Sequence, residues 1–322
     1  MTRWLRLTDA PPPPAAVEIA ANRVSAATLE LRGGQPVVAQ FGTEPLPEGA
    51  LVPSLTAPNA RDRATVVGAL GRVLDRIGRP KRVGIILPDP VAKVSLIRFE
   101  HVPARQQDLE QLVRWQMRKT APFAIDDAQV SFVPGLQTTE GREFVVSLAR
   151  RDIVREYEGL CEEVGTYAGL VDLATFNIIN AVLASSGPPA HDWLVVNVTA
   201  EYASLAILRG DAVIFFRNRG SDTDGTLPDL VHQASMYYED RLAGHGLTRV
   251  VLAGVAAGGA EPGYIEEARR SLEERLGKRV DVVDPRTAAA LTDRISAGSA
   301  LLDTLAPLVG LLLRGQDAHV AQ

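Results

Sequence analysis

The chain has 322 residues, of which 46% are hydrophobic and 23% are charged, and its formal net charge is -5. This composition is that of a globular protein and excludes a disordered chain. Lys and Arg form no long run, so the sequence offers no basic stripe and predicts no nucleic-acid partner. The single cysteine, Cys161, excludes an internal disulfide and is expected to be a small buried residue. The five histidines lie far apart in sequence, which gives no indication of metal catalysis.

Both ends of the chain are predicted to be tails. Residues 1–14, MTRWLRLTDAPPPP, lack the apolar stretch of a signal peptide, and their prolines cannot continue a helix, so a flexible tail is expected. Residues 316–322 form the second tail. The most apolar segment, residues 300–313, contains Asp303 and Pro307 and is shorter than the roughly 20 residues of a membrane-spanning helix. The sequence therefore predicts a soluble protein in which this helix is buried.

The first lobe is predicted to begin with a β-meander. Three short extended runs, separated by tight turns, indicate its strands at residues 16–21, 24–32 and 35–40. Apolar residues recur at helical spacing over 61–77, which predicts a helix packed on the meander. The apolar run 83–87 then suits a strand that is covered on both faces.

An inserted subdomain is predicted to follow the first meander and its helix. The pattern indicates the order strand, helix, strand, strand and helix, at residues 91–99, 105–119, 128–133, 143–149 and 152–164. In this order the two helices are expected to cover one face of a small sheet.

The second lobe repeats the plan of the first. A second meander is predicted at 193–198, 202–208 and 212–217, and a helix follows at 227–242. The remaining predicted elements are a strand at 249–253, a helix at 264–276, a strand at 279–283 and helices at 286–295 and 300–313. Two lobes on one plan indicate an internal duplication.

These patterns divide the chain into two lobes, one insertion and two tails. The core of the first lobe is expected at 15–90 and 168–190, the inserted subdomain at 91–167 and the second lobe at 191–315. The inserted subdomain is also the candidate for binding a partner.

Several stretches, taken in order, resemble a known family. They are VEIAANRVSAATLEL at 17–31, LPDPVAKVSLIRFEHVP at 87–103, RWQMRKTAPFAIDDAQVSF at 114–132, LVDLATFNIINAV at 170–182 and VVLAGVAAGGAEPGYIE at 250–266. Their order is similar to that in the PilM proteins of type IV pilus assembly, relatives of FtsA and of the cytoplasmic part of GspL. The resemblance covers nearly the whole chain after Pro14, with the first stretch similar to the family's phosphate hairpin and the last to its adenosine loop.

The resemblance implies an α/β, actin-like ATPase (ribonuclease H-like) fold with two lobes and a small inserted α+β subdomain. It also implies a cytoplasmic scaffold of a type IV pilus or related secretion machine. The implied partners are the cytoplasmic tail of a PilN-like, single-pass membrane protein and the pilus motor ATPases. The protein is then expected to be cytoplasmic and peripheral to the inner membrane, which it reaches through these partners.

The resemblance also places a nucleotide pocket, whose residues depart from the family pattern. Ala20 and Asn22 stand where the family has Asp and Gly, and Asn197 and Thr199 stand where it has Asp-x-Gly. Because acidic residues hold the magnesium of such a site, ATP with Mg is expected to bind weakly or not at all, and the protein to be a pseudo-ATPase rather than an enzyme. The candidate nucleotide contacts are Ala20, Asn22, Arg23, Asn197, Thr199, Ala200, Gly254, Gly258 and Gly259, and no catalytic or metal-binding residue is assigned.

Two other interpretations of the pocket and of the family remain open. In a working nucleotide-gated switch, carboxylates such as Glu18, Glu30 or Asp224 would replace the missing metal ligands. In a GspL-like component of a type II secretion system, the chain would usually continue into a membrane helix. The glycine-rich turn that contains Gly254 equally suits a nucleotide contact and a plain turn between a strand and a helix.

A groove for the partner tail is expected on the inserted subdomain. Extended tails dock on aromatic-lined clefts or exposed strand edges. The residues predicted to line this groove are Arg114, Trp115, Arg118, Phe123 and Asp126.

Overall fold

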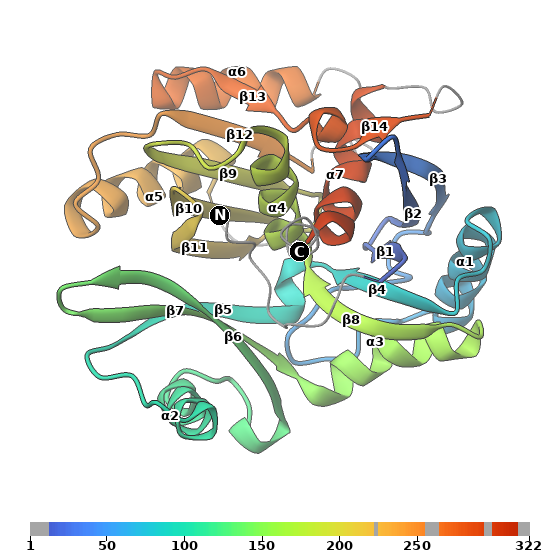
Figure 1. Cartoon of the computed structure of the whole chain (residues 1–322), viewed down its shortest axis with the longest axis horizontal. Coiled ribbons are helices and arrows are strands. Elements are labelled where there is room, and N and C mark those ends of the chain that lie inside the picture. Colours follow the sequence, from blue (N-terminus) through green and yellow to red (C-terminus); the bar gives the residue numbers. More distant parts are fainter. Residues whose placement is uncertain (1–12, 222–224, 255–263, 293–297, 315–322) are drawn as a thin grey trace.

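The computed structural model describes residues 13–221, 225–254, 264–292 and 298–314. Three sheets, of six, five and three strands, organise these residues. The two larger sheets form two lobes, and the small sheet lies beside both of them (Figure 1). The predicted tail at 316–322 and most of the tail at 1–14 lie outside the described residues.

The six-stranded sheet forms the first lobe. Its strands, in order across the sheet, are β14 (Ala290–Leu291), β3 (Gln35–Pro45), β2 (Arg23–Arg32), β1 (Ala15–Ile19), β4 (Arg82–Leu87) and β8 (Tyr167–Leu173). Successive side chains of a strand point to opposite faces, so Val17 and Ile85 pack with helix α1 (Arg63–Arg76), whereas Ala16 and Ile86 pack with helix α7 (Ser299–Leu313). The apolar run in β4 is therefore buried on both faces, as its sequence predicts.

The second lobe is a five-stranded sheet. Its strands, in order, are β11 (Ala212–Gly220), β10 (Tyr202–Arg209), β9 (Asp192–Val198), β12 (Arg249–Ala253) and β13 (Val280–Val282). Helices α5 (Leu227–Arg241) and α6 (Tyr264–Leu276) pack with one face, and helix α4 (Ala174–Ser186) packs with the other.

The strand pairing of the two lobes is the same. Strand β1 pairs antiparallel with β2 and parallel with β4. Strand β9 likewise pairs antiparallel with β10 and parallel with β12. The duplication predicted from the sequence is thus present in the topology.

The small sheet belongs to the insertion. Its strands, in order, are β5 (Ala92–Phe99), β7 (Gly141–Arg150) and β6 (Ala128–Thr138), and the helices of this region are α2 (Gln106–Arg118) and α3 (Arg151–Glu163). Helix α2 covers one face of the sheet, with Val113 and Met117 in a cluster with Phe144 and Leu148. Helix α3 instead joins the core of the first lobe through Tyr157. The expectation that both helices cover one face of the small sheet is therefore wrong, because the apolar stripe of α3 is buried by the larger sheet.

Two segments differ from the predicted elements. Residues 286–295 are not a helix where they are described: Pro285–Thr287 form a short 3-10 turn, η3, and β14 pairs parallel with β3. Residues 167–186, for which no element was predicted, form β8 and α4. Helix α4 lies beside α7 between the lobes (Figure 1).

The described residues were compared with the requirements of a membrane-spanning helix and of a metal site. Within the described ranges, no helix is both long and apolar enough to cross a bilayer. The same residues contain no group of three or more His, Cys, Asp and Glu side chains placed to hold a metal ion. Cys161 is buried, as expected.

Candidate functional site

The turns of two equivalent hairpins line one cavity between the lobes. In the first hairpin, the Ala20 N–H donates to the Arg23 carbonyl at 2.9 Å, and in the second the Thr199 N–H donates to the Tyr202 carbonyl at 2.8 Å. The cavity measures about 20 Å³. That volume holds one water molecule, whereas pockets for small molecules are typically about 300–1,000 Å³.

Most of the predicted nucleotide contacts are brought together at this cavity, which we call the closed cleft. Its lining includes Ala20, Asn22, Arg23, Asn197, Thr199 and Gly254. Ala200 instead lines a wider space of about 690 Å³, which we call the interlobe cleft. Asn22 lines both cavities. Gly258 and Gly259 lie outside the described residues.

A buried ion pair closes the cleft from the side of the first lobe. The Arg23 Nη2 atom donates to Glu18 Oε2 at 2.7 Å, and the side chains are only 13% and 8% exposed. Burial raises the pKa of the Glu18 carboxyl, the Arg23 guanidinium opposes the rise, and the carboxylates of Asp303 and Asp89 add to it. The cation that faces Glu18 is therefore an arginine of the same hairpin.

Asp303 closes the cleft from the other side. Its Oδ1 atom accepts the Gly254 backbone N–H at 2.6 Å. Gly254 has φ +87°, and a Cβ at this position would lie 2.5 Å from Asn197 Oδ1, so only glycine fits there. Asp303 was not among the site residues predicted from the sequence. The one sequence feature that marks it is that it is the single acidic residue of α7, an otherwise apolar helix.

The carboxyl group behind the closed cleft is Asp89, which is fully buried. It accepts hydrogen bonds from the hydroxyl and backbone N–H of Thr175 and, at 2.6 Å, from the Ser204 hydroxyl. Burial raises the pKa of the Asp89 carboxyl, and the hydrogen bonds from Ser204 and Thr175 oppose the rise. The Asn197 amide donates to the Thr175 hydroxyl at 3.0 Å. Asn197 thus contributes to a network inside the protein.

The carboxylates considered as replacement metal ligands lie in different places. Glu18 lines the closed cleft. Glu30 pairs with Arg32 at the surface, where each side chain is 58% exposed, and Asp224 lies outside the described residues. Of these three carboxylates, Glu18 is the one that the described residues place at the closed cleft, and there it faces Arg23.

The predicted partner residues lie around α2, on the side of the small sheet that this helix covers. Trp115 is 57% exposed, with Lys119 Nζ 4.6 Å from its ring centre. Arg114 donates to the Ile125 carbonyl at 2.9 Å, which ties α2 to the turn that contains Asp126. Phe123 packs against the α2 core, and Arg118 lies exposed at the end of the helix.

A groove of about 400 Å³ lies elsewhere on the insertion, between the small sheet, α3 and β8. We call it the β8 groove. Its floor includes Ser131 and Ser147, which are paired across β6 and β7. Its α3 wall carries Arg155 and Glu158, and Tyr167, 63% exposed, lies on β8. Burial, and then the Glu162 carboxylate, raises the pKa of the Glu158 carboxyl.

Strand β8 is an edge strand in the described sheet, since it pairs only with β4. An exposed edge offers backbone N–H and C=O groups to which an extended peptide can add as a further strand. Side chains of alternate peptide residues would then reach the small floor residues or the charged wall. This groove was not predicted from the sequence because β8 was not predicted as a strand.

Comparison with known proteins places the chain in a family. The family model for the type IV pilus assembly protein PilM matches residues 16–240. Among solved structures, a chain of a PilM–PilN type IV pilus biogenesis complex is 19% identical with a TM-score of 0.76, and the match covers 93% of this chain and 96% of that one. A Bacteroides thetaiotaomicron protein with an actin-like ATPase fold is 8% identical with a TM-score of 0.49, covering 83% and 89% of the two chains. The cytoplasmic domain of EpsL, from the type II secretion system of Vibrio cholerae, is 6% identical with a TM-score of 0.46, covering 74% and 80%. The chain therefore belongs to the PilM family of type IV pilus assembly proteins and has the actin-like ATPase fold that the resemblance implied.

Proposed function

We propose that this protein is a scaffold of a type IV pilus machine, a pseudo-ATPase that holds the cytoplasmic tail of a PilN-like, single-pass membrane protein. The observation that carries the proposal is the Glu18–Arg23 pair in a cleft of about 20 Å³. The guanidinium supplies the positive charge that a magnesium ion supplies in an active site of this fold. The protein is then peripheral to the inner membrane through its partner, and contact with the motor ATPases is part of the same proposal.

The β8 groove is the proposed site for the tail. It combines an open strand edge with a wall that carries both signs of charge, from Arg155 and Glu158. A further support is that the similar solved structure with a TM-score of 0.76 is itself a PilM–PilN complex. The face around Trp115 and Phe123, predicted from the sequence, is the competing location.

Nucleotide binding tests the closed cleft. Calorimetric titration of the purified protein with Mg-ATP and Mg-ADP is expected to give no saturable binding up to millimolar ligand, because the loss of two charged contacts of about 1.5–3 kcal/mol each weakens binding by decades. Saturable binding at micromolar ligand would overturn the pseudo-ATPase assignment. It would favour a nucleotide-gated switch in which the cleft opens and Glu18 and Asp303, which both line it, face the metal.

Tail binding distinguishes the two faces of the insertion. Ser131→Trp fills the β8 groove and is expected to weaken binding of the synthetic partner tail by at least about tenfold, a loss of roughly 1.4 kcal/mol. Trp115→Ala and Phe123→Ala are expected to leave the dissociation constant within about twofold, since these residues lie on the α2 side. Fluorescence anisotropy measures all three. Weakening by the two alanine variants alone would place the tail on the α2 face instead.

A further inference from the structure

Pro13, the first described residue, marks the place where the preceding residues leave the fold. It is buried, and a Cβ at Gly84 of β4 would lie 2.7 Å from its Cγ atom. Gly84 is paired in register with Leu170 of β8, which lines the β8 groove. Because neighbouring strands lie about 4.8 Å apart, the chain leaves the fold roughly 10 Å from the position that a further strand beside β8 would take.

Residues 1–12, which we call the N-terminal segment, are long enough to enter this groove. The prolines at 11–14 cannot continue a helix and favour an extended chain. An extended chain advances about 3.3 Å per residue, so Leu7 can lie up to roughly 20 Å from Pro13. The segment therefore reaches the open edge of β8 and has length left to run along it.

The sequence of the segment, MTRWLRLTDAPP, suits an added strand. Side chains of a strand alternate between its two faces, so Leu5 and Leu7 lie on one face and Arg6 on the other. The leucines match the apolar side chain of Leu170 in the groove. The two arginines of the segment outnumber its single acidic residue, so it carries a net positive charge.

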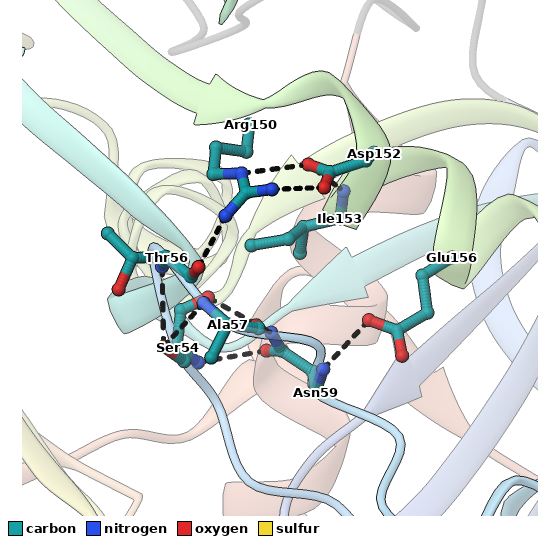
Figure 2. A network of polar contacts seen from close by, with 8 residues as sticks. All are labelled: Ser54, Thr56, Ala57, Asn59, Arg150, Asp152, Ile153 and Glu156. Carbon is teal, nitrogen blue, oxygen red and sulfur yellow. Dashed lines mark hydrogen bonds and ion pairs between the residues drawn. The ribbon is translucent and has the colours of Figure 1, made fainter. Parts of the chain in front are cut away.

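The α3 wall of the groove is held in place by contacts elsewhere on the helix. Both carboxylate oxygens of Glu156 accept backbone N–H groups, from Asn59 at 2.8 Å and from Ala60 at 3.0 Å (Figure 2). Arg150, at the end of β7, pairs with Asp152, with Nε 3.0 Å from Oδ1 (Figure 2). The wall is therefore preorganised by the chain itself, which reduces the ordering cost of binding a peptide.

One carboxylate of this wall is available to an occupant. Glu158 lines the groove and has no hydrogen bond or ion pair to another described residue. Burial and the Glu162 carboxylate raise the pKa of the Glu158 carboxyl, and the Arg155 guanidinium opposes the rise. A further positive charge in the groove would stabilise the ionised form. Arg6 supplies such a charge on the face opposite the leucines.

The other end of the chain lies near the same groove and is the alternative occupant within this protein. Arg314, the last described residue, pairs with Asp172, which lines the groove. The residues that follow, GQDAHVAQ at 315–322, contain no Lys or Arg and one large apolar residue, Val320. They lack both features of the N-terminal segment, which is therefore the better match.

We propose that the N-terminal segment binds in the β8 groove as an additional strand beside β8. Arg6 then faces Glu158, and the two leucines lie next to Leu170. Because the segment is joined to the fold at Pro13, its effective concentration at the groove is about 1 mM. A segment that binds with a dissociation constant of about 0.1 mM when free then fills the groove about nine-tenths of the time when attached. On the proposed function, the partner tail must displace it, and removing the segment strengthens tail binding about tenfold.

The test uses a synthetic peptide of residues 1–12, titrated by calorimetry into three forms of the protein. The form that lacks residues 2–10 is expected to bind it with a dissociation constant of about 0.1 mM. The full-length protein is expected to bind it about tenfold more weakly, because its own segment fills the groove. Deletion of residues 315–322 is the matched control and should leave the weak binding of the full-length protein unchanged.

Substitutions in the groove locate the peptide. In the form that lacks residues 2–10, Ser131→Trp fills the groove and is expected to weaken peptide binding by at least about tenfold. An Arg6→Glu peptide is expected to bind about threefold more weakly, the size of the effect of a charge pair near the surface, and Glu158→Arg to restore its affinity. Glu162→Arg, at an exposed position of the same helix, is the control and should not restore it.

Three results would overturn the proposal. They are equal peptide affinities of the full-length and truncated forms, undiminished binding to the Ser131→Trp form, and no binding at millimolar peptide. If the truncated form does not fold by circular dichroism, the full-length chain with Leu5→Asp and Leu7→Asp takes its place with the same expected outcomes. Equal affinities, together with binding of the full-length form alone to vesicles that contain phosphatidylglycerol, would assign the segment to a membrane surface instead. Failure of the partner tail to bind in the anisotropy experiment would remove the proposed function and leave this result intact.

Discussion

At the scale of single residues, Asp172 and Arg314 form a buried ion pair. Their charged atoms are 2.7 Å apart, and neither side chain has exposed surface. Burial raises the pKa of Asp172 to about 6, and the Arg314 guanidinium opposes the rise. Asp172 also lines the β8 groove, so the pair fixes the last described residue of the chain beneath the proposed tail site.

The raised pKa predicts how stability depends on pH. Between the usual pKa of 3.8 and about 6, the folded protein holds a proton on Asp172 that the unfolded chain has released. The contribution of Asp172 therefore stabilises the protein at low pH and is lost as the pH rises through this window, by on the order of 3 kcal/mol.

Urea unfolding of the wild type and of Asp172→Asn at pH 4.5 and 6.5 measures the effect. The variant lacks this titration. The free energy of unfolding of the wild type minus that of the variant should therefore be more positive at pH 4.5 than at pH 6.5. A difference that is the same at both values, or larger at pH 6.5, would contradict the assignment.

At the scale of elements, the contact of α4 with α7 depends on a glycine. A Cβ at Gly310 would lie 1.7 Å from the Asn177 carbonyl oxygen, a distance that requires the helices to move apart. Val309 and Leu311 on either side are fully buried, so the separation would also open the core between the lobes.

Gly310→Ala is therefore expected to destabilise the protein by about 3 kcal/mol or more, as overpacking in a core does. Gly68→Ala in α1 is the matched control, because a Cβ there meets only Arg72 Nη1, at 3.4 Å. It should stabilise by roughly 0.5–1 kcal/mol, through the lower flexibility of alanine in a helix. Thermal unfolding measures both. Equal changes in the two variants would show that the close approach of α4 and α7 has no energetic role.

The elements that the sequence predicted well are those with a local signal. The apolar run at 83–87 and the periodic segments at 227–242 and 264–276 correspond to β4, α5 and α6. The predicted helix at 286–295 is wrong because its alanine-rich sequence favours a helix, whereas pairing of Ala290 and Leu291 with β3 places a strand there. Pairing between residues so far apart leaves no local pattern. For the same reason the edge strand β8, and the groove beside it, were not predicted.

At the scale of the whole molecule, Asp89 joins elements from both lobes. Its donors are Thr175 of α4 and Ser204 of β10. Each hydroxyl also accepts a hydrogen bond from an amide, Thr175 from Asn197 and Ser204 from Asn218. Both hydroxyls must therefore donate to Asp89, which fixes the direction of the whole network.

Asp89→Asn places an amide nitrogen against a donor in either orientation of the amide, because Oδ1 accepts the Thr175 backbone N–H and Oδ2 accepts the hydroxyls of Thr175 and Ser204. We expect a loss of about 1–3 kcal/mol in the free energy of unfolding, the cost of an unsatisfied buried polar group. Asp108→Asn, at an exposed position of α2, is the control and should change little. Chemical denaturation measures both variants. An unchanged midpoint for Asp89→Asn would mean that the network does not join the lobes energetically.

The lining of the closed cleft was predictable only in part. The hairpin residues Ala20, Asn22 and Asn197 could be found because the resemblance fixes their positions. The contribution of Asp89 and Asp303 could not, because each acts on residues distant in sequence, at Ser204 and Gly254. That Arg23 faces Glu18 depends on rotamers selected by packing, which a sequence pattern does not encode.

The Arg23 guanidinium has one further consequence. A cation that belongs to the chain is present at a fixed, high effective concentration next to Glu18 and cannot be depleted or exchanged with the surroundings. On the proposed function, a frame held this way keeps its shape when cellular ATP falls or when free magnesium changes. On the proposed function, the timing of pilus extension and retraction is then set by the motors, while this protein gives them an anchorage that does not respond to the energy state of the cell.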